Sequence, residues 1–135
     1  MKLIIGGACQ GKLAWAKKHY TEITDDGWID GKTCGLKEIN SCGGIYDFHE
    51  YIRRVMLDKS QSEKIRLQPD TLAEMIIQNN PDIIIISDEI GYGLVPVDEF
   101  DRNYREQTGR ICTKLAAFSD QVVRVVMGIG MCIKG

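Results

Sequence analysis

A glycine-rich stretch near the start of the chain has the residue types and spacing of a phosphate-binding loop. The apolar run Leu3-Ile4-Ile5 is followed by Gly6-Gly7-Ala8-Cys9-Gln10-Gly11-Lys12-Leu13. Glycines allow the backbone to curl so that successive N–H groups point at an anion, and a lysine at this position reaches the outer phosphates. The spacing G-x-x-x-x-G-K therefore predicts that residues 6–13 bind ATP or GTP, with Lys12 also stabilising a migrating phosphoryl group.

The position after the lysine departs from this pattern. A Ser or Thr hydroxyl normally ligates Mg²⁺ there, whereas this chain has Leu13. We therefore expect a weakened magnesium site. The alternative is a glycine-rich turn that carries a lysine by chance, but the place of the segment between a strand and a helix favours phosphate binding.

Two acids after a second apolar run are the candidate metal ligands. The run Ile83–Ile86 is continuous and branched, as in a central parallel strand, and Asp88-Glu89 follow it closely. Ligands of open α/β sheets bind at the carboxyl ends of strands, so both acids are predicted to face the phosphates. We expect Asp88 and Glu89 to hold Mg²⁺. An acidic junction in water is the alternative.

Two arginines and two histidines are weaker candidates. Arg102 and Arg105 lie one turn apart, where they either clamp a nucleotide or acidic substrate or pair with neighbouring acids on a solvated face. Spacing alone favours the second reading. His19 and His49 have no adjacent acid pattern that would mark an activated imidazole, so we interpret them as packed or exposed residues.

The elements that must position these residues alternate between helix and strand. The predicted order is a strand at 3–5, a helix at 12–20, loops with one or two short strands at 21–44, an amphipathic helix at 46–58, a connector at 59–67, a helix from 69 to about 79, a strand at 82–87, a helix at 98–107 that breaks or bends near Gly109 and resumes to 120, and a strand at 122–127. This order predicts an α/β fold of the P-loop type, a mainly parallel sheet with helices on both faces. At 135 residues we expect a single domain, 1–135.

Composition restricts the binding partners and the cellular compartment that we expect for this protein. The net charge is −2 and no Lys/Arg cluster is present, which argues against nucleic acid. No apolar run reaches the roughly 18 residues of a membrane span, and Met1-Lys2-Leu3 leads into a strand rather than a signal peptide. The five cysteines form no C-x-x-C pair. We expect a cytoplasmic protein with reduced thiols, without a zinc site or a membrane partner.

Several blocks together resemble a known family. They are Gly6-Gly7-Ala8-x-x-Gly11-Lys12, Asp88-Glu89-Ile90-Gly91-x-Gly93-Leu94-Val95-Pro96, Arg102-x-Tyr104-Arg105 with Gly109-Arg110, and Gly128-Ile129 with Ile133-Lys134. This pattern is similar to the adenosylcobinamide kinase/adenosylcobinamide-phosphate guanylyltransferase family of cobalamin biosynthesis. The resemblance implies a P-loop fold that commonly forms homo-oligomers. It also implies phosphoryl transfer to adenosylcobinamide, and transfer of GMP through a guanylylated histidine.

Carried over by motif, the resemblance implies that residues 6–12 bind the triphosphate. It places Glu89 at the metal or substrate hydroxyl, and Arg102 and Arg105 in the nucleotide or substrate site. The chain lacks the histidine-bearing segment of the family, and Cys112-Thr113 and Gly130-Met131 replace its Asn-Gln and Pro-Leu. We therefore expect guanylyl transfer to be lost.

The reading favoured by sequence is a cobinamide-kinase-like phosphotransferase that uses ATP or GTP. Two alternatives stay open: a non-catalytic relative that binds a nucleotide or a corrinoid, and a small kinase for another hydroxyl-bearing metabolite. Leu13 favours the non-catalytic reading, and the Glu89 block with both arginines favours the enzyme.

Overall fold

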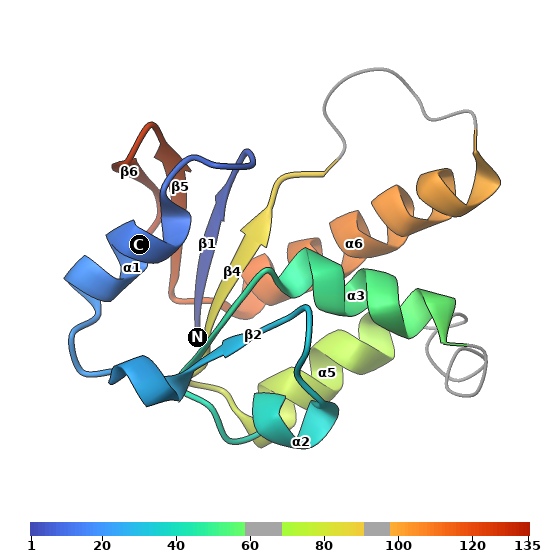
Figure 1. Ribbon diagram of the computed structural model, residues 1–135, viewed down its shortest axis with the longest axis horizontal. Helices are drawn as coiled ribbons and strands as arrows, with labels where there is room; N and C mark the ends of the chain where they lie inside the picture. Colours follow the sequence, from blue (N-terminus) through green and yellow to red (C-terminus); the bar gives the residue numbers. More distant parts are fainter. Residues whose placement is uncertain (59–68, 91–97) are drawn as a thin grey trace.

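A six-stranded sheet runs through the protein in the computed structural model, which describes residues 1–58, 69–90 and 98–135 (Figure 1). The strand order is β2-β3-β4-β1-β5-β6; the first five strands are parallel and β6 is antiparallel to β5. The strands are β1 (Lys2–Gly6), β2 (Trp28–Asp30), β3 (Gly44–Tyr46), β4 (Ile84–Asp88), β5 (Gln121–Val126) and β6 (Ile129–Lys134). The mainly parallel α/β sheet predicted from the sequence is confirmed.

Helices cover both faces of the sheet, as predicted. They are α1 (Lys12–His19), α2 (Leu36–Ile39), α3 (Phe48–Leu57), α5 (Pro69–Asn79) and α6 (Glu99–Phe118), with a 3₁₀ turn at Asp25–Gly27. Figure 1 shows α1 on one side of the sheet and α3, α5 and α6 on the other. Neighbouring residues of β1 point to opposite faces, so Leu3 packs into the core under α3, α5 and α6 while Ile4 packs under α1.

The continuous isoleucine run is buried because both faces of its strand are covered. Ile83 to Ile86 are each at most 3% exposed, and they contribute alternately to the two cores.

The apolar stripe of α3 is likewise buried at Phe48, Tyr51, Ile52, Val55 and Met56. This helix begins later than expected because Tyr46 ends β3 and Asp47 has a left-handed backbone, φ 51°.

The predicted break near Gly109 is wrong. Helix α6 is continuous from Glu99 to Phe118, and its buried stripe of Tyr104, Thr108, Ile111 and Leu115 passes the glycine without interruption. Tertiary packing of such a stripe outweighs the roughly 1 kcal/mol that an interior glycine costs a helix. The helical spacing of the buried residues from Tyr104 to Leu115 therefore predicts this helix better than the position of Gly109 does.

The prediction of a last strand at β5 missed a hairpin. Met127 and Gly128 have φ angles of 49° and 75°, and they turn the chain so that Val126 pairs with Ile129 on β6. Two successive residues with positive φ form the tight turn that matches the twist of antiparallel strands.

Within the described residues, no helix is long and apolar enough to cross a membrane.

Candidate functional site

The segment after β1 folds as a tight loop that ends where α1 begins. Gly6 lies so close to the carbonyl oxygen of Val125 that a side chain would collide with it. Gly11 has a left-handed backbone, φ 82°, and its carbonyl accepts the first helical bond, from the N–H of Trp15 at 2.9 Å. Both glycines of the spacing are thus required by the local geometry, one by close approach and one by its backbone angle.

The Lys12 side chain lies inside this loop rather than in solvent. It is 8% exposed, and its Nζ donates to the carbonyl of Gly7 at 2.6 Å. The same atom pairs with Oδ1 of Asp88 at 2.6 Å. Strands β1 and β4 are neighbours with Gly6 opposite Asp88, so the acid after the second apolar run does lie at the loop.

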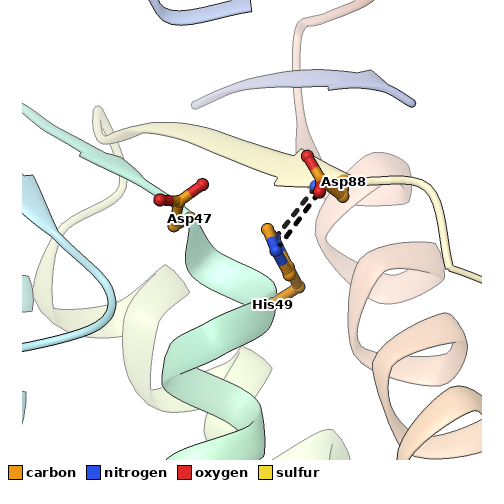
Figure 2. Close-up of side chains that lie close together, drawn as sticks. All are labelled: Asp47, His49 and Asp88. Carbon is orange, nitrogen blue, oxygen red and sulfur yellow. Dashed lines mark hydrogen bonds and ion pairs between the residues drawn. The ribbon is translucent and has the colours of Figure 1, made fainter. Parts of the chain in front are cut away.

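Asp47 and His49 join Asp88 at the same edge of the sheet. Asp47 follows β3, the neighbour of β4, and His49 lies in the first turn of α3. Figure 2 shows the three side chains together, and a ligand atom of each lies within 4.8 Å of those of the others. Asp47 was not among the predicted site residues, and His49, interpreted from the sequence as packed or exposed, is buried beside Asp88.

The hydrogen bonds of His49 fix its tautomer. Its Nδ1 accepts the backbone N–H of Asp88 at 3.1 Å, so in the neutral ring the proton sits on Nε2. That nitrogen lies 3.4 Å from Oδ2 of Asp88 (Figure 2). A protonated Nε2 cannot ligate a metal, and the arrangement instead holds the Asp88 carboxylate in place.

The backbone of His49 is anchored as well. The hydroxyl of Tyr104 on α6 donates to the His49 carbonyl at 2.9 Å within the core. Burial raises the pKa of the Tyr104 phenol, so this side chain remains protonated and a donor at neutral pH. Helix α6 thereby helps to set the position of the imidazole.

The Asp47 carboxylate does not cap its own helix. Asp47 occupies the N-cap position of α3, where aspartate usually accepts a backbone hydrogen bond, yet its side chain makes no such bond. Its Oδ2 lies 3.5 Å from Nζ of Lys32, and this proximity raises the pKa of the lysine. Such a departure from local preference is typical of functional sites.

A known protein family matches the part of the chain that contains this cluster. The family model described as "Cobinamide kinase / cobinamide phosphate guanyltransferase" matches residues 45–133, about two thirds of the chain. The protein belongs to this family. The resemblance inferred from sequence is confirmed, and the matched range includes Asp47, His49 and Asp88 but not the phosphate loop.

Two curated relatives in the family are bifunctional adenosylcobalamin biosynthesis proteins. The chain is 40% identical over 52 residues to the one from Salmonella typhimurium and 38% identical over 52 residues to the one from Escherichia coli. In each comparison the aligned segment covers 38% of this chain and 29% of the relative. The chain thus matches less than a third of the length of either protein.

The family pattern places Glu89 at the metal or the substrate hydroxyl, but this carboxylate has a different partner from that of Asp88. The Glu89 carboxylate is 9% exposed and pairs with the guanidinium of Arg124 on β5. Among the described residues, the cluster of Asp47, His49 and Asp88 does not include Glu89. The catalytic role of Glu89 stays a prediction.

The two arginines of the family pattern lie on α6. Arg102 is exposed, and Arg105 lines a cavity whose walls come from α5 and α6. Among the described residues, the cluster of Asp47, His49 and Asp88 contains neither arginine. The part of the family pattern from Gly91 to Pro96, and the connector 59–67, lie outside the described residues.

The remaining loop residues have structural contacts. Leu13 packs against the core under α1. Gln10 ties the loop to the hairpin, because its Oε1 accepts the N–H of Met127 at 2.7 Å and its carbonyl accepts the N–H of Gly128 at 2.8 Å. Ala8 and Cys9 are exposed, and Gly7 is partly so.

Proposed function

We propose that this protein binds a nucleoside triphosphate at residues 6–13 and transfers its γ-phosphoryl group to a hydroxyl. Adenosylcobinamide is the first acceptor to test, because the family and its curated relatives act in cobalamin biosynthesis. The observation that carries the proposal is the buried Nζ of Lys12, which sits inside a glycine loop at the end of β1 and contacts the acid at the end of β4.

The Lys12–Asp88 pair supports phosphate binding because Lys12 supplies a buried positive charge. Asp88 neutralises this charge in the structure, and a phosphate can neutralise it instead. Lys12 points into the loop, and a phosphate oxygen can take the place of the Asp88 oxygen at 2.6 Å. The positive end of α1 and the loop N–H groups attract the same anion. Entry of the triphosphate would release the Asp88 carboxylate toward the outer phosphates.

The residues present fit a magnesium ion. Mg²⁺ prefers carboxylate oxygens and water, and the Asp47 and Asp88 oxygens lie within 4.8 Å of each other. Leu13 supplies no ligand, and the Nδ1 bond of His49 leaves no nitrogen lone pair for the ion. We therefore assign the ion to Asp88, as predicted from sequence, and to Asp47 in addition. When bound, the ion would supply positive charge that neutralises the charge developing on the phosphates.

The reaction we propose is in-line phosphoryl transfer. The acceptor oxygen forms a bond to the γ-phosphorus, the bond from that phosphorus to the bridging oxygen breaks, and the nucleoside diphosphate leaves. Lys12 stabilises the migrating charge, and a carboxylate at this edge takes the hydroxyl proton. We keep Glu89 as the candidate for that role, because Asp47 is assigned to the ion.

Guanylyl transfer is not part of this proposal. The two histidines have other partners: His49 is buried against Asp88, and Nδ1 of His19 lies 2.8 Å from the carbonyl of Trp15. The second candidate function is a non-catalytic nucleotide-binding relative. Leu13 favours it, since this residue removes a metal ligand that transfer normally needs.

The deciding experiment is transfer of labelled γ-phosphate from ATP and from GTP, with Mg²⁺, onto adenosylcobinamide. Lys12→Ala is the blank, Asp47→Asn tests the added ligand, and Asp25→Asn, at an acid that is 92% exposed, is the matched control. We expect transfer by wild type and the control, and at least about a hundredfold loss in the other two. Equal rates in wild type and Lys12→Ala would refute the kinase; binding without transfer would favour the second candidate.

A further inference from the structure

A cavity of about 450 Å³ lies between α1 and the turn of the β5–β6 hairpin. One wall is the face of α1 that carries Trp15, Lys18 and His19, and the other is the turn at Gly128 and Gly130. A volume of this size falls in the range of small-molecule sites. Nothing in the proposed phosphate chemistry uses this cavity.

The cavity opens directly beside the phosphate loop. Gly11, the last glycine of the loop, also lines the cavity. The turn is fixed to the loop by both hydrogen bonds of Gln10, so the two sites are held at a constant separation. The other described cavities lie between α3 and α6, α2 and α3, and α5 and α6, and their described lining contains no residue of the loop.

The lining suits an aromatic ligand with a polar rim. The rings of Trp15 and His19 are stacked, with centroids 4.0 Å apart and planes 16° from parallel. Gly130 contacts the indole, and a side chain there would collide with Trp15. Met127 and Ile129 stand beside the cavity with exposures of 81% and 68%, so apolar surface is available to cover a ligand.

We propose that this cavity binds the base and ribose of the nucleoside triphosphate. The inference rests on the proposed function, because it needs the phosphates to occupy the loop. In this proposal the nucleoside end of a triphosphate held at Lys12 leaves the loop past Gly11. This cavity begins at Gly11. The aromatic and apolar lining accounts for binding of the base, and Lys18 adds a positive charge to the lining.

The test compares nucleotides with inorganic tripolyphosphate, which has the phosphates and no nucleoside. Affinities of ATP, GTP and tripolyphosphate are measured by calorimetry on wild type, Trp15→Ala and His19→Ala. Lys17→Ala, on the same helix and absent from the cavity lining, is the control. Circular dichroism checks folding, and the exposed His19 keeps the test valid if Trp15→Ala unfolds.

We expect at least one nucleotide to bind more than about tenfold more tightly than tripolyphosphate. Trp15→Ala and His19→Ala should lose at least about fivefold of that nucleotide's affinity and none of the tripolyphosphate affinity. Equal binding of nucleotide and tripolyphosphate, or equal loss for both ligands in the variants, overturns the inference while the phosphate site stands. Absence of binding by all three ligands overturns the proposed function as well.

Discussion

Arg124 holds the carboxylate of Glu89 with two parallel hydrogen bonds, Nε to Oε1 at 2.7 Å and Nη2 to Oε2 at 3.1 Å. The pair links the residue after β4 to the middle of β5, across the end of β1, and so braces the three strands that carry the loop. The backbone N–H of Glu89 also donates to the carbonyl of Gly6 at 2.8 Å. A structural role for Glu89 therefore stands beside the catalytic role predicted from sequence.

The first prediction separates these two roles by a double-mutant cycle. Glu89→Gln and Arg124→Gln should each lower the free energy of unfolding by about 1–2 kcal/mol, and their coupling should be about 1 kcal/mol because Arg124 is 41% exposed. Urea denaturation measures both quantities. If Arg124→Gln keeps phosphoryl transfer while Glu89→Gln abolishes it, Glu89 is catalytic; equal losses in both indicate bracing.

The second prediction concerns the buried His49. His49→Leu leaves the N–H of Asp88 without its acceptor, which should cost about 1–3 kcal/mol of stability. His49→Asn should recover part of this loss, because an amide oxygen can replace Nδ1 as acceptor. Chemical denaturation of the three proteins checks the order. A Leu variant as stable as the Asn variant would show that the Nδ1 bond contributes little.

The third prediction uses two glycines whose surroundings are equally open. A Cβ added to Gly109 or Gly128 would meet no atom within 4 Å, so only backbone conformation distinguishes the two sites. Gly109→Ala, in the middle of α6, should stabilise the protein by about 0.5–1 kcal/mol. Gly128→Ala, at φ 75°, should destabilise it by about 1 kcal/mol. Thermal unfolding that changes in the same direction for both would contradict this account.

The fourth prediction is a loss of stability in alkali. Burial raises the pKa of the Cys42 and Cys112 thiols to about 11 and that of the Tyr51 phenol to about 12. The unfolded chain therefore loses these protons first, and the free energy of unfolding falls as pH rises above about 9, until the folded groups also ionise. The decline should be measurable between pH 9 and 11 by urea titration, and weaker in Cys42→Ala.

The central strands could be predicted from local sequence alone. Continuous branched runs at Leu3–Ile5 and Ile83–Ile86 are typical of strands that are covered on both sides, and each is followed by the residues that face the edge. The mutual position of Lys12 and Asp88 follows from the pairing of those two strands. These features depend on periodicity and topology, which a sequence displays directly.

Asp47 and His49 could not be found in the same way. Their contact with Asp88 depends on β3 pairing with β4, two segments separated by a long stretch of chain, and β3 is only three residues long. For Asp47 the available signal was an acid directly after a short apolar segment, as for Asp88. Placing the helix start at Tyr46 concealed it.

The C-terminal hairpin was hidden by its composition. Met127-Gly128 is not a common pair for a turn with two positive φ angles, and Ile129, Met131 and Ile133 are exposed rather than buried. Side-chain alternation on an edge strand carries little information when neither face is part of the core.

The central place of β1 in the sheet also has a consequence for biosynthesis. Its two neighbours are Ile84–Asp88 and Gln121–Val126, so the strand emerges from the ribosome long before either partner exists. At the usual rates of translation the interval to β5 is on the order of ten seconds. The apolar strand that leads into the loop is therefore open to chaperones and proteases during synthesis, and the loop reaches its final geometry only when the last third of the chain has been made.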